Sequence, residues 1–316
     1  MNIRHAINPD TGAEYENKFV AVDDIGMERG SCIVDDRVCA ALFPLRPHQI
    51  CIDMEGPREA LSALLGAATA QAFMCARERK LPARIFTECQ PDDTERIVLL
   101  NEFGYEDNDG LVRMAHFIDG SPVNPPIPEG VTVLHDYLED PVEARYFLMR
   151  YNRLYTAEQT MEYVGQMQEQ PGFRRYLVIA DEGLLGEVLV KLEGDAGQIL
   201  FLHVNANCRR QGIGSYLMQL AIYSLAQRGA KRVDMDVRVR TPGLMRFLKR
   251  LGFEQDQLLM RYLGLDWNPG EEERRLRRHE AEAEPDAPDA EEPLMTKPEP
   301  HRSERPIAQD PEEWDS

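Results

Sequence analysis

The feature that most constrains this chain is an internal repeat at a constant spacing of 148 residues. The segment ARIFTECQPDDTERIVLLNEFGYEDNDGLVRMA, residues 83–115, aligns without a gap with KRVDMDVRVRTPGLMRFLKRLGFEQDQLLMRYL, residues 231–263. Each segment predicts a strand, a helix, a Gly-aromatic turn and a second strand, and Gly104 corresponds to Gly252. The same spacing aligns the helix in PREALSALLGAATAQAFMCARERK with the helix that follows Arg-Arg-Gln-Gly. We therefore expect two copies of one α/β unit.

Composition separates the two copies from the rest of the chain. The stretch DGSPVNPPIPEG is dense in Pro and Gly, which is typical of a linker. Beyond Trp267 the chain is rich in Glu, Asp and Pro, so it buries too little surface to offset its ordering entropy. We expect a disordered acidic tail there, and a role for it as an interaction segment stays open. The expected parts are an N-terminal extension, a shortened first copy, a linker, a complete second copy and the tail, at residues 1–17, 18–118, 119–130, 131–267 and 268–316.

Charge and cysteine usage exclude several classes of partner. The net charge is -19, and sixteen acidic against seven basic residues lie beyond residue 267. Such a chain lacks the clustered Lys and Arg that neutralise phosphate backbones, which argues against nucleic acid. The six cysteines form no C-x-x-C pair and have no His at metal-ligand spacing, so we expect reduced thiols and no metal. Without an apolar signal segment or a bilayer-length apolar run, we expect a cytoplasmic protein with no membrane partner.

One segment of the second copy has an unusual junction between a strand and a helix. In ILFLHVNANCRRQGIGSYLMQLAIYSLAQRG, an apolar strand breaks into two arginines and Gly-Ile-Gly before an amphipathic helix begins. A helix N-terminus offers unpaired N–H groups and partial positive charge, and glycines let an anion approach the backbone. No Gly-Lys-Ser/Thr follows, and Leu217 occupies the third glycine position of a dinucleotide fingerprint. From the residues alone, a pyrophosphate cradle and a tight strand-to-helix turn both stay open.

The segment resembles the acyl-CoA-binding motif of the GNAT superfamily, the Gcn5-related N-acetyltransferases. In that motif an apolar strand leads into Arg/Gln-x-x-Gly-x-Gly/Ala at the start of a helix. Here Arg209, Gly212 and Gly214 fill the three positions, and the order of elements over residues 131–263 agrees with the family. The first copy has Leu61 in place of the arginine, so it resembles a degenerate, shorter member.

The resemblance implies an α+β fold with two tandem domains, each a mixed central sheet flanked by helices. It implies that acetyl-CoA is the acyl donor, that the backbone of Leu202–Val204 binds the pantetheine arm, and that Arg209–Ser215 wraps the pyrophosphate. The strand that holds Val204 would separate from the strand that holds Val237 and so admit the thioester. The residues assigned to the donor by this resemblance are Leu202, His203, Val204, Arg209, Arg210, Gln211, Gly212, Ile213, Gly214, Ser215, Thr241 and Phe247.

The proton carriers expected of the family are absent. Many members have a Tyr after the Phe in the helix before Gly-Phe, but here Phe247 is followed by Leu248. A position that holds a glutamate base in some members is Gln198, which is not a base at neutral pH. The usual Pro after the strand is Ala206, and the Asn that often opens the last helix is Thr241. We therefore expect donor binding and leave the general acid and base unassigned.

Three residues are weak candidates for the catalytic group: Glu187, Asp236 and His203. Strict alternation along the strand puts His203 on the face opposite Gln198, which favours a core or surface histidine over a base. Asp234 and Asp236 share one strand face, where they either recognise a cationic amine or form a solvated surface. Glu187 lies on the neighbouring strand, where it could act through a water molecule.

Two hypotheses about function follow. In the first, the second copy transfers acetyl from acetyl-CoA to a primary amine by direct attack in a ternary complex, while the first copy is structural and walls the acceptor site. In the second, the protein binds acyl-CoA without turnover as a regulator or scaffold, because the Tyr and Glu are missing. The identity of the amine, the acyl length and the choice between monomer and homodimer stay open, since specificity in such a fold lies in its loops.

Overall fold

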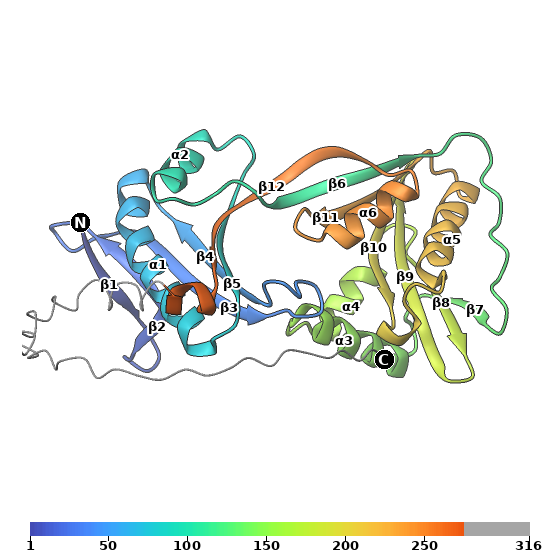
Figure 1. The fold of residues 1–316 in the computed structure, drawn as a ribbon, viewed down its shortest axis with the longest axis horizontal. Coiled ribbons are helices and arrows are strands. Elements are labelled where there is room, and N and C mark those ends of the chain that lie inside the picture. Colours follow the sequence, from blue (N-terminus) through green and yellow to red (C-terminus); the bar gives the residue numbers. More distant parts are fainter. Residues whose placement is uncertain (275–316) are drawn as a thin grey trace, which may run out of the picture. The chain divides into compact units, whose positions relative to one another are not determined.

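The computed structural model describes residues 1–274, of which residues 1–272 form one compact unit (Figure 1). Most of the predicted tail, residues 275–316, lies outside the described residues. The first copy holds β1 (Asn2–Ile7), β2 (Glu14–Val22), β3 (Glu28–Val38), β4 (His48–Glu55), α1 (Arg58–Arg79), β5 (Ala83–Cys89), α2 (Thr94–Glu102) and β6 (Gly110–Phe117). The second copy holds β7 (Thr132–Asp136), α3 (Pro141–Tyr155), α4 (Met161–Gln168), β8 (Arg174–Ala180), β9 (Gly183–Glu193), β10 (Ala196–Val204), the short 3₁₀ turn η1 (Ala206–Cys208), α5 (Ile213–Gln227), β11 (Arg232–Arg238), α6 (Pro242–Arg250) and β12 (Glu254–Trp267).

The repeat is visible in the order and the bounds of the elements. Both ends of α2 and α6 differ by 148 residues, and each helix lies between two strands. The copies differ at the long helix, because α1 begins at Arg58 whereas α5 begins only at Ile213. At the 148-residue spacing, the first turns of α1 therefore correspond to the loop 206–212. The first copy continues its helix through the positions where the second copy has the Gly-Ile-Gly turn.

All strands belong to one mixed sheet, in the order β1-β2-β3-β4-β5-β12-β6-β11-β10-β9-β8-β7. The last strand of each copy is exchanged: β6 pairs with β11 of the second copy, and β12 pairs with β5 of the first. β12 also pairs with β6 over Glu254–Arg261, and these two strands run side by side (Figure 1). The sheet of each copy therefore contains a strand from the other.

Helices flank both faces of this sheet. α1 and α2 form one core with β2–β5, and α5 and α6 form a second core with β6 and β8–β11. α3 and α4 pack over Leu189 and Phe201, whereas the neighbouring Val188 and Val190 lie in the core under α5. Because alternate strand residues point to opposite faces, α3 and α4 cover the face opposite α5. The predicted α+β fold with a mixed sheet flanked by helices is confirmed.

The long helix α1 is the one helix within residues 1–274 that has the length and apolar composition of a membrane span. One side of it packs in the core of the first copy through Ala60, Leu61, Leu64, Leu65, Ala68, Ala72 and Ala76. Core packing accounts for the apolar composition of this helix.

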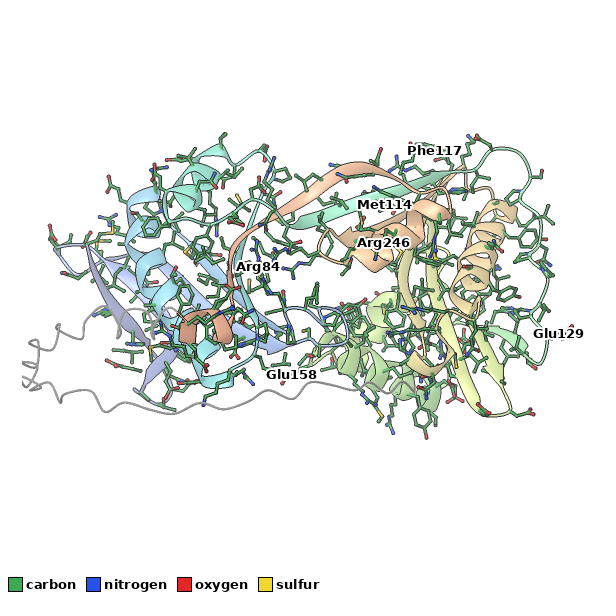
Figure 2. All side chains as sticks on the ribbon, viewed as in Figure 1. Arg84, Met114, Phe117, Glu129, Glu158 and Arg246 are labelled. Carbon is green, nitrogen blue, oxygen red and sulfur yellow. The ribbon has the colours of Figure 1, made fainter. Side chains whose placement is uncertain are left out.

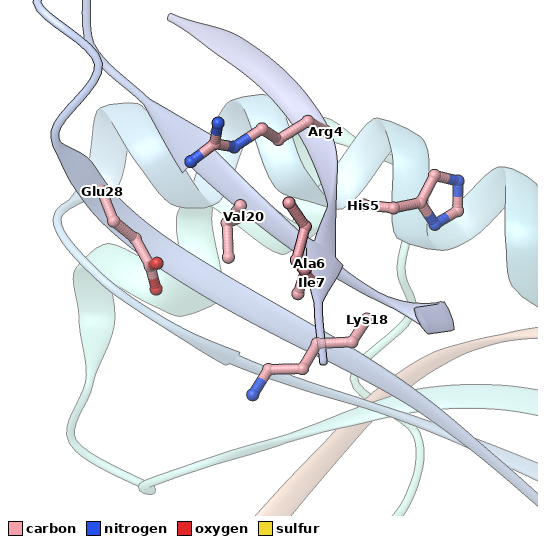
Figure 3. A pocket seen from close by; sticks show the side chains of 7 residues that line it. All are labelled: Arg4, His5, Ala6, Ile7, Lys18, Val20 and Glu28. Carbon is pink, nitrogen blue, oxygen red and sulfur yellow. The ribbon is translucent and has the colours of Figure 1, made fainter. Parts of the chain in front are cut away.

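Residues 1–17, set apart in the sequence as an extension, form β1 and the beginning of β2. β1 is an edge strand that pairs only with β2 among the strands described. Side chains of β1–β3 line a shallow pocket of about 270 Å³ (Figure 3): Arg4, His5, Ala6, Ile7, Lys18, Val20 and Glu28. This pocket belongs wholly to the first copy and contains none of the residues assigned to the acyl donor.

Candidate functional site

The two central strands of the second copy separate part way along their length. β10 and β11 pair in parallel from Ala196–Arg232 to Ile199–Met235, and this pairing then ends. β10 stays paired with β9 as far as Val204, and β11 stays paired with β6 on its other side. In the part of the chain that the structure describes, residues 200–204 therefore have no strand partner on the edge facing β11, as the family resemblance implies. An extended ligand can hydrogen-bond to such an edge as an added strand.

The loop that follows β10 contains backbone N–H groups that have no acceptor within residues 1–274. Arg210 and Gly212 have left-handed backbone angles, with φ of 64° and 86°, and α5 begins directly after Gly212. The first N–H of this helix to find a partner is that of Tyr216, which donates to the Gly212 carbonyl at 2.9 Å. Within residues 1–274, the N–H groups of residues 210–215 donate to no acceptor. Successive free N–H groups at a helix N-terminus form a concave anion-binding site.

Side chains hold this loop against the end of β10. The Nε of Arg209 donates to the Val204 carbonyl at 3.3 Å, which leaves the rest of the exposed guanidinium free to meet a ligand. The Nε2 of Gln211 donates to the Asn207 carbonyl at 3.2 Å. The exposed Arg210 adds a second positive charge at the same place. The loop therefore combines free N–H groups with two arginines, a combination suited to phosphate.

The other residues assigned to the donor surround the gap between β10 and β11. A methyl group on Gly214 would lie 3.5 Å from Cγ2 of Val204 and 3.7 Å from Cζ of Phe247, so the end of β10, the start of α5 and α6 meet there. Thr241 is the N-cap residue of α6, and its hydroxyl donates to the Arg238 carbonyl at the end of β11. Leu202 and Val204 pack at the edge of the core beneath α5, and Ile213 is buried in it.

The residue after Phe247 provides no acid. Leu248 is completely buried and belongs to the core under α5 and α6. A tyrosine at this position would have to leave that orientation to reach the gap. The core therefore accommodates an apolar side chain at this position, where many members of the family have a tyrosine.

The predicted orientation of His203 is wrong because β10 contains a bulge. The register with β9 shifts between Ile199, opposite Val190, and Phe201, opposite Leu189, which leaves Leu200 as an extra residue. One extra residue reverses the alternation of everything after it. His203 consequently lies on the same face as Gln198, not on the opposite face.

The side chain of His203 is half-buried on the face of the sheet that α3 and α4 cover. Its ring stacks on Phe201 with ring centroids 6.2 Å apart, and its register partner on β9 is Glu187. Burial lowers the pKa of His203 below the usual histidine value, and the charges of Arg150 and Arg209 act in the same direction. The negative charge of Glu187 raises this pKa, but burial has the larger effect. The imidazole is therefore predominantly neutral at neutral pH and can accept a proton.

Glu187 is fully buried and its carboxylate is already occupied. Oε1 accepts from Nε of Arg150 at 2.8 Å, and Oε2 accepts from Nε of Arg175 at 2.8 Å. Arg175 is also completely buried, and its Nη1 forms an ion pair with Asp136 on β7. Two arginines donate to this one carboxylate and fix its position, so Glu187 is arranged to orient its neighbours.

Asp236 is the first residue of β11 beyond its pairing with β10. Nε and Nη2 of Arg113 donate to its two oxygens at 2.8 and 3.0 Å, and Nε2 of Gln198 donates to Oδ2 at 3.3 Å. Asp234 lies on the same strand face and is instead paired with Arg232. Arginines therefore hold both carboxylates of this strand face, and Asp234 is buried whereas Asp236 is partly exposed.

Sequence analysis did not identify Arg113, Arg150 or Arg175. The signal that could have revealed two of them is an arginine within a mostly apolar strand: Arg113 in GLVRMAHF and Arg175 in RRYLVIA. A charged side chain in such a position needs a buried partner. Its partner, however, comes from another strand or helix, and pairing between distant segments cannot be read from one sequence.

Comparisons with known proteins point to one family. Residues 133–253 match the acetyltransferase (GNAT) family. N-alpha-acetyltransferase 30 of Xenopus laevis and that of Homo sapiens are each 28% identical over 92 residues, which make up 28% of this chain and 34% and 25% of those proteins. The match thus spans about a third or less of the length of these relatives.

One of the solved structures that align with this chain shares its fold. A conserved protein of unknown function from Enterococcus faecalis V583, described as a probable N-acyltransferase, aligns with a TM-score of 0.50 and 10% identity over 78% of this chain and 61% of that chain. A GCN5-related N-acetyltransferase from Sphaerobacter thermophilus aligns with a TM-score of 0.46 and 18% identity over 81% of this chain and 82% of that chain.

Proposed function

We propose that this chain, whose residues 133–253 match the acetyltransferase (GNAT) family, transfers acetyl from acetyl-CoA to a primary amine. The observation that carries the proposal is the row of free N–H groups at residues 210–215, next to the free edge of β10. A diphosphate and an extended amide-containing arm are the two parts of CoA that such features bind.

The donor is proposed to bind along β10 and the start of α5. The N–H groups of residues 210–215 and the side chains of Arg209 and Arg210 would hold the pyrophosphate. The backbone of Leu202–Val204 would hold the pantetheine arm in the gap between β10 and β11. Phe247 and Thr241 border that gap from α6. Binding there delivers the thioester to the point where the strands separate.

The reaction needs two proton transfers. The amine nitrogen bonds to the thioester carbon, the carbon–sulfur bond breaks, one amine proton leaves to a base, and the CoA thiolate takes up a proton. We assign the base to His203, because it lies on the free segment of β10 and its lowered pKa keeps it neutral. Direct attack within a ternary complex requires positioning above all, and this accounts for much of the expected acceleration.

A second function, acyl-CoA binding without turnover, is favoured by one observation. The position on α6 where the family's tyrosine would protonate the thiolate holds the buried Leu248, which cannot donate a proton. Solvent can still protonate a thiolate, which is why the catalytic function is preferred. Thiol release with a panel of amines separates the two functions: CoA formation supports transfer, whereas binding without CoA formation supports a regulator or scaffold.

The first experiment is calorimetric titration of acetyl-CoA and free CoA into the wild-type protein. The matched variant combines Gly212→Asp with Arg209→Ala, which puts a negative charge in the loop and removes a positive one. Micromolar binding that is lost in the variant supports the proposed donor site. Absence of binding to the folded wild-type protein, with its folding checked by circular dichroism, would overturn it.

A further inference from the structure

The first copy contributes a charged side chain to the point where β10 and β11 separate. Arg113 lies on β6, the last strand of the first copy, which is inserted between β11 and β12. Its neighbour Met114, which Figure 2 labels, is buried in the core that includes residues of α5 and α6. Because strand residues alternate, Arg113 projects onto the other face of the sheet, where it meets Asp236.

The carboxylate of Asp236 is held firmly yet stays reachable. Arg113 binds both of its oxygens in a bidentate pair, and Gln198 binds Oδ2 from β10. The side chain of Asp236 is 24% exposed and that of Arg113 is 30% exposed. A carboxylate has about four lone-pair positions. Three are occupied here, so one position on Oδ1 remains for a donor that enters from outside.

The same face carries the proposed base. Gln198 lies opposite Asp234 in the parallel register, and Asp234 and Asp236 alternate on one strand face. The bulge at Leu200 returns His203 to this face. The gap between the strands is therefore bordered by a neutral imidazole on β10 and by a fixed carboxylate on β11.

From this geometry we infer that Asp236 binds the ammonium group of the acceptor and that Arg113, supplied by the first copy, is the positioning residue that fixes this carboxylate. The inference rests on the proposed function and deepens it by assigning the acceptor as an amine recognised in its cationic form. The ammonium donates one N–H to Oδ1 of Asp236 and loses one proton to His203, which frees the nitrogen lone pair to attack the thioester carbon. As the carbon–sulfur bond breaks, the nitrogen gives up a second proton, which passes to the departing CoA thiolate, and His203 returns its proton to solvent. The first copy is thereby a required part of the acceptor site.

The test compares three changes in the full-length protein. Arg113→Met and Asp236→Asn should each raise the acceptor KM about tenfold, as expected for one charge-assisted contact, with a smaller change in kcat. The third change exchanges the partners, Arg113→Asp with Asp236→Arg, which restores an ion pair but moves the carboxylate to β6. If the pair were merely structural, the exchange would restore KM; if position matters, KM stays raised.

A matched control comes from the same strand face. Arg232 on β11 is also half-buried and ion-paired, to Asp234 and Asp256, but it lies at the end where β10 and β11 remain paired. Arg232→Met should leave the acceptor KM within about twofold of wild type. A comparable rise in Arg232→Met would contradict the assignment, because any lost ion pair on this face would then have the same effect.

Acceptor binding is measured without turnover as well, so that the two proposals fail separately. Spermidine, 2-phenylethylamine and a short peptide with a free N-terminus are titrated into the CoA-saturated protein, together with the alcohol 2-phenylethanol. Weaker binding of the amines to both single variants, with unchanged acetyl-CoA affinity, supports the inference. Two results would overturn the inference while leaving acetyl-CoA binding intact. One is amine binding that is unchanged in Arg113→Met and Asp236→Asn, and the other is no amine binding to the wild-type protein.

Discussion

Gly212 determines the backbone course of the donor loop. Its φ of 86° is one that side chains rarely adopt, whereas Gly214 lies in the first turn of α5 with room for a methyl group. Gly212→Ala should therefore lower the free energy of unfolding by about 1 kcal/mol and weaken acetyl-CoA binding several-fold. Gly214→Ala is the control and should stay close to wild type in both denaturant melts and calorimetry. Equal losses in the two variants would contradict the assigned geometry.

His203 should set the acidic limb of the activity profile. Its pKa is lowered by burial, so kcat/KM should rise with pH through a value below the ordinary histidine pKa of about 6.5 and reach its plateau by neutral pH. His203→Gln should reduce kcat about a hundredfold or more and abolish this limb, with little change in acetyl-CoA affinity. Steady-state rates between pH 5 and 9 test this, and an unchanged profile in His203→Gln would remove the residue from the mechanism.

The same shift has a defined effect on stability. The unfolded chain binds a proton at its exposed histidine more readily than the native protein does at His203. The free energy of unfolding should therefore decrease as the pH falls through the ordinary histidine range, and this contribution should be smaller in His203→Gln. Glu187, Arg150 and Arg209 are the charged groups that influence the pKa of His203.

A single residue explains why the orientation of His203 could not be read from the sequence. The run ILFLHV is apolar almost throughout, so it carries no alternation that would reveal an extra residue. Leu200 becomes that extra residue only because β9 and β10 pair in a shifted register. The loop glycines, in contrast, were predictable, because a positive φ and an open backbone favour glycine whatever lies around them.

At the level of elements, Glu187 joins α3, β8 and β9. Its two arginine partners come from α3 and β8, and Arg175 extends the network to β7. Glu187→Ala should lower the free energy of unfolding by about 3–5 kcal/mol, because it leaves Arg175 buried without its charge partner. Glu143→Ala is the control: that carboxylate is 46% exposed and lies 3.5 Å from the same arginine, so its loss should cost well under 1 kcal/mol. Chemical denaturation of both variants provides the measurement.

The order of elements was predictable, but the partner of each strand was not. The 148-residue spacing aligns α2 with α6 residue for residue, because apolar periodicity and Gly-aromatic turns are local signals. It is equally consistent with two separate domains and with exchanged strands, since β6 and β12 have the same pattern in either arrangement. The contact between Arg113 and Asp236 depends on the exchange, so it could not be predicted from either copy alone.

On the scale of the whole chain, the exchange makes the two copies parts of one sheet. β6 covers the hydrogen-bonding edge of β11, and β12 covers that of β5. Side chains strengthen the connection: Arg238 of β11 bonds to Asp109 and stacks on Phe86 and Tyr262, from β5 and β12. Thr156 at the end of α3 donates to the Val38 carbonyl of β3 at 2.7 Å. The first copy therefore contributes strands and side chains that complete the sheet of the second copy, although it lacks the donor loop.

This arrangement predicts how the second copy behaves alone. A fragment of residues 119–274 contains every residue of the donor site but lacks β6, so the edges of β11 and β12 would be exposed. Unpaired edges of this kind lead to misfolding, aggregation or pairing with another chain. We expect the fragment to be insoluble or to form dimers by strand exchange, whereas residues 1–274, in which β6 pairs with both strands, should stay soluble.

Co-expression tests whether the fragment misbehaves because β6 is missing or because its ends are badly chosen. Residues 1–118 supplied as a separate chain contain β6, so they should rescue the solubility of 119–274 and restore its affinity for acetyl-CoA. Introducing Arg113→Met into the supplied fragment should preserve the rescue, because Met114 and the strand backbone still fill the sheet, but should leave amine binding weak. A soluble monomeric 119–274 with native donor affinity would show that the exchanged strand is dispensable for the fold, and that the two copies share a sheet without depending on it.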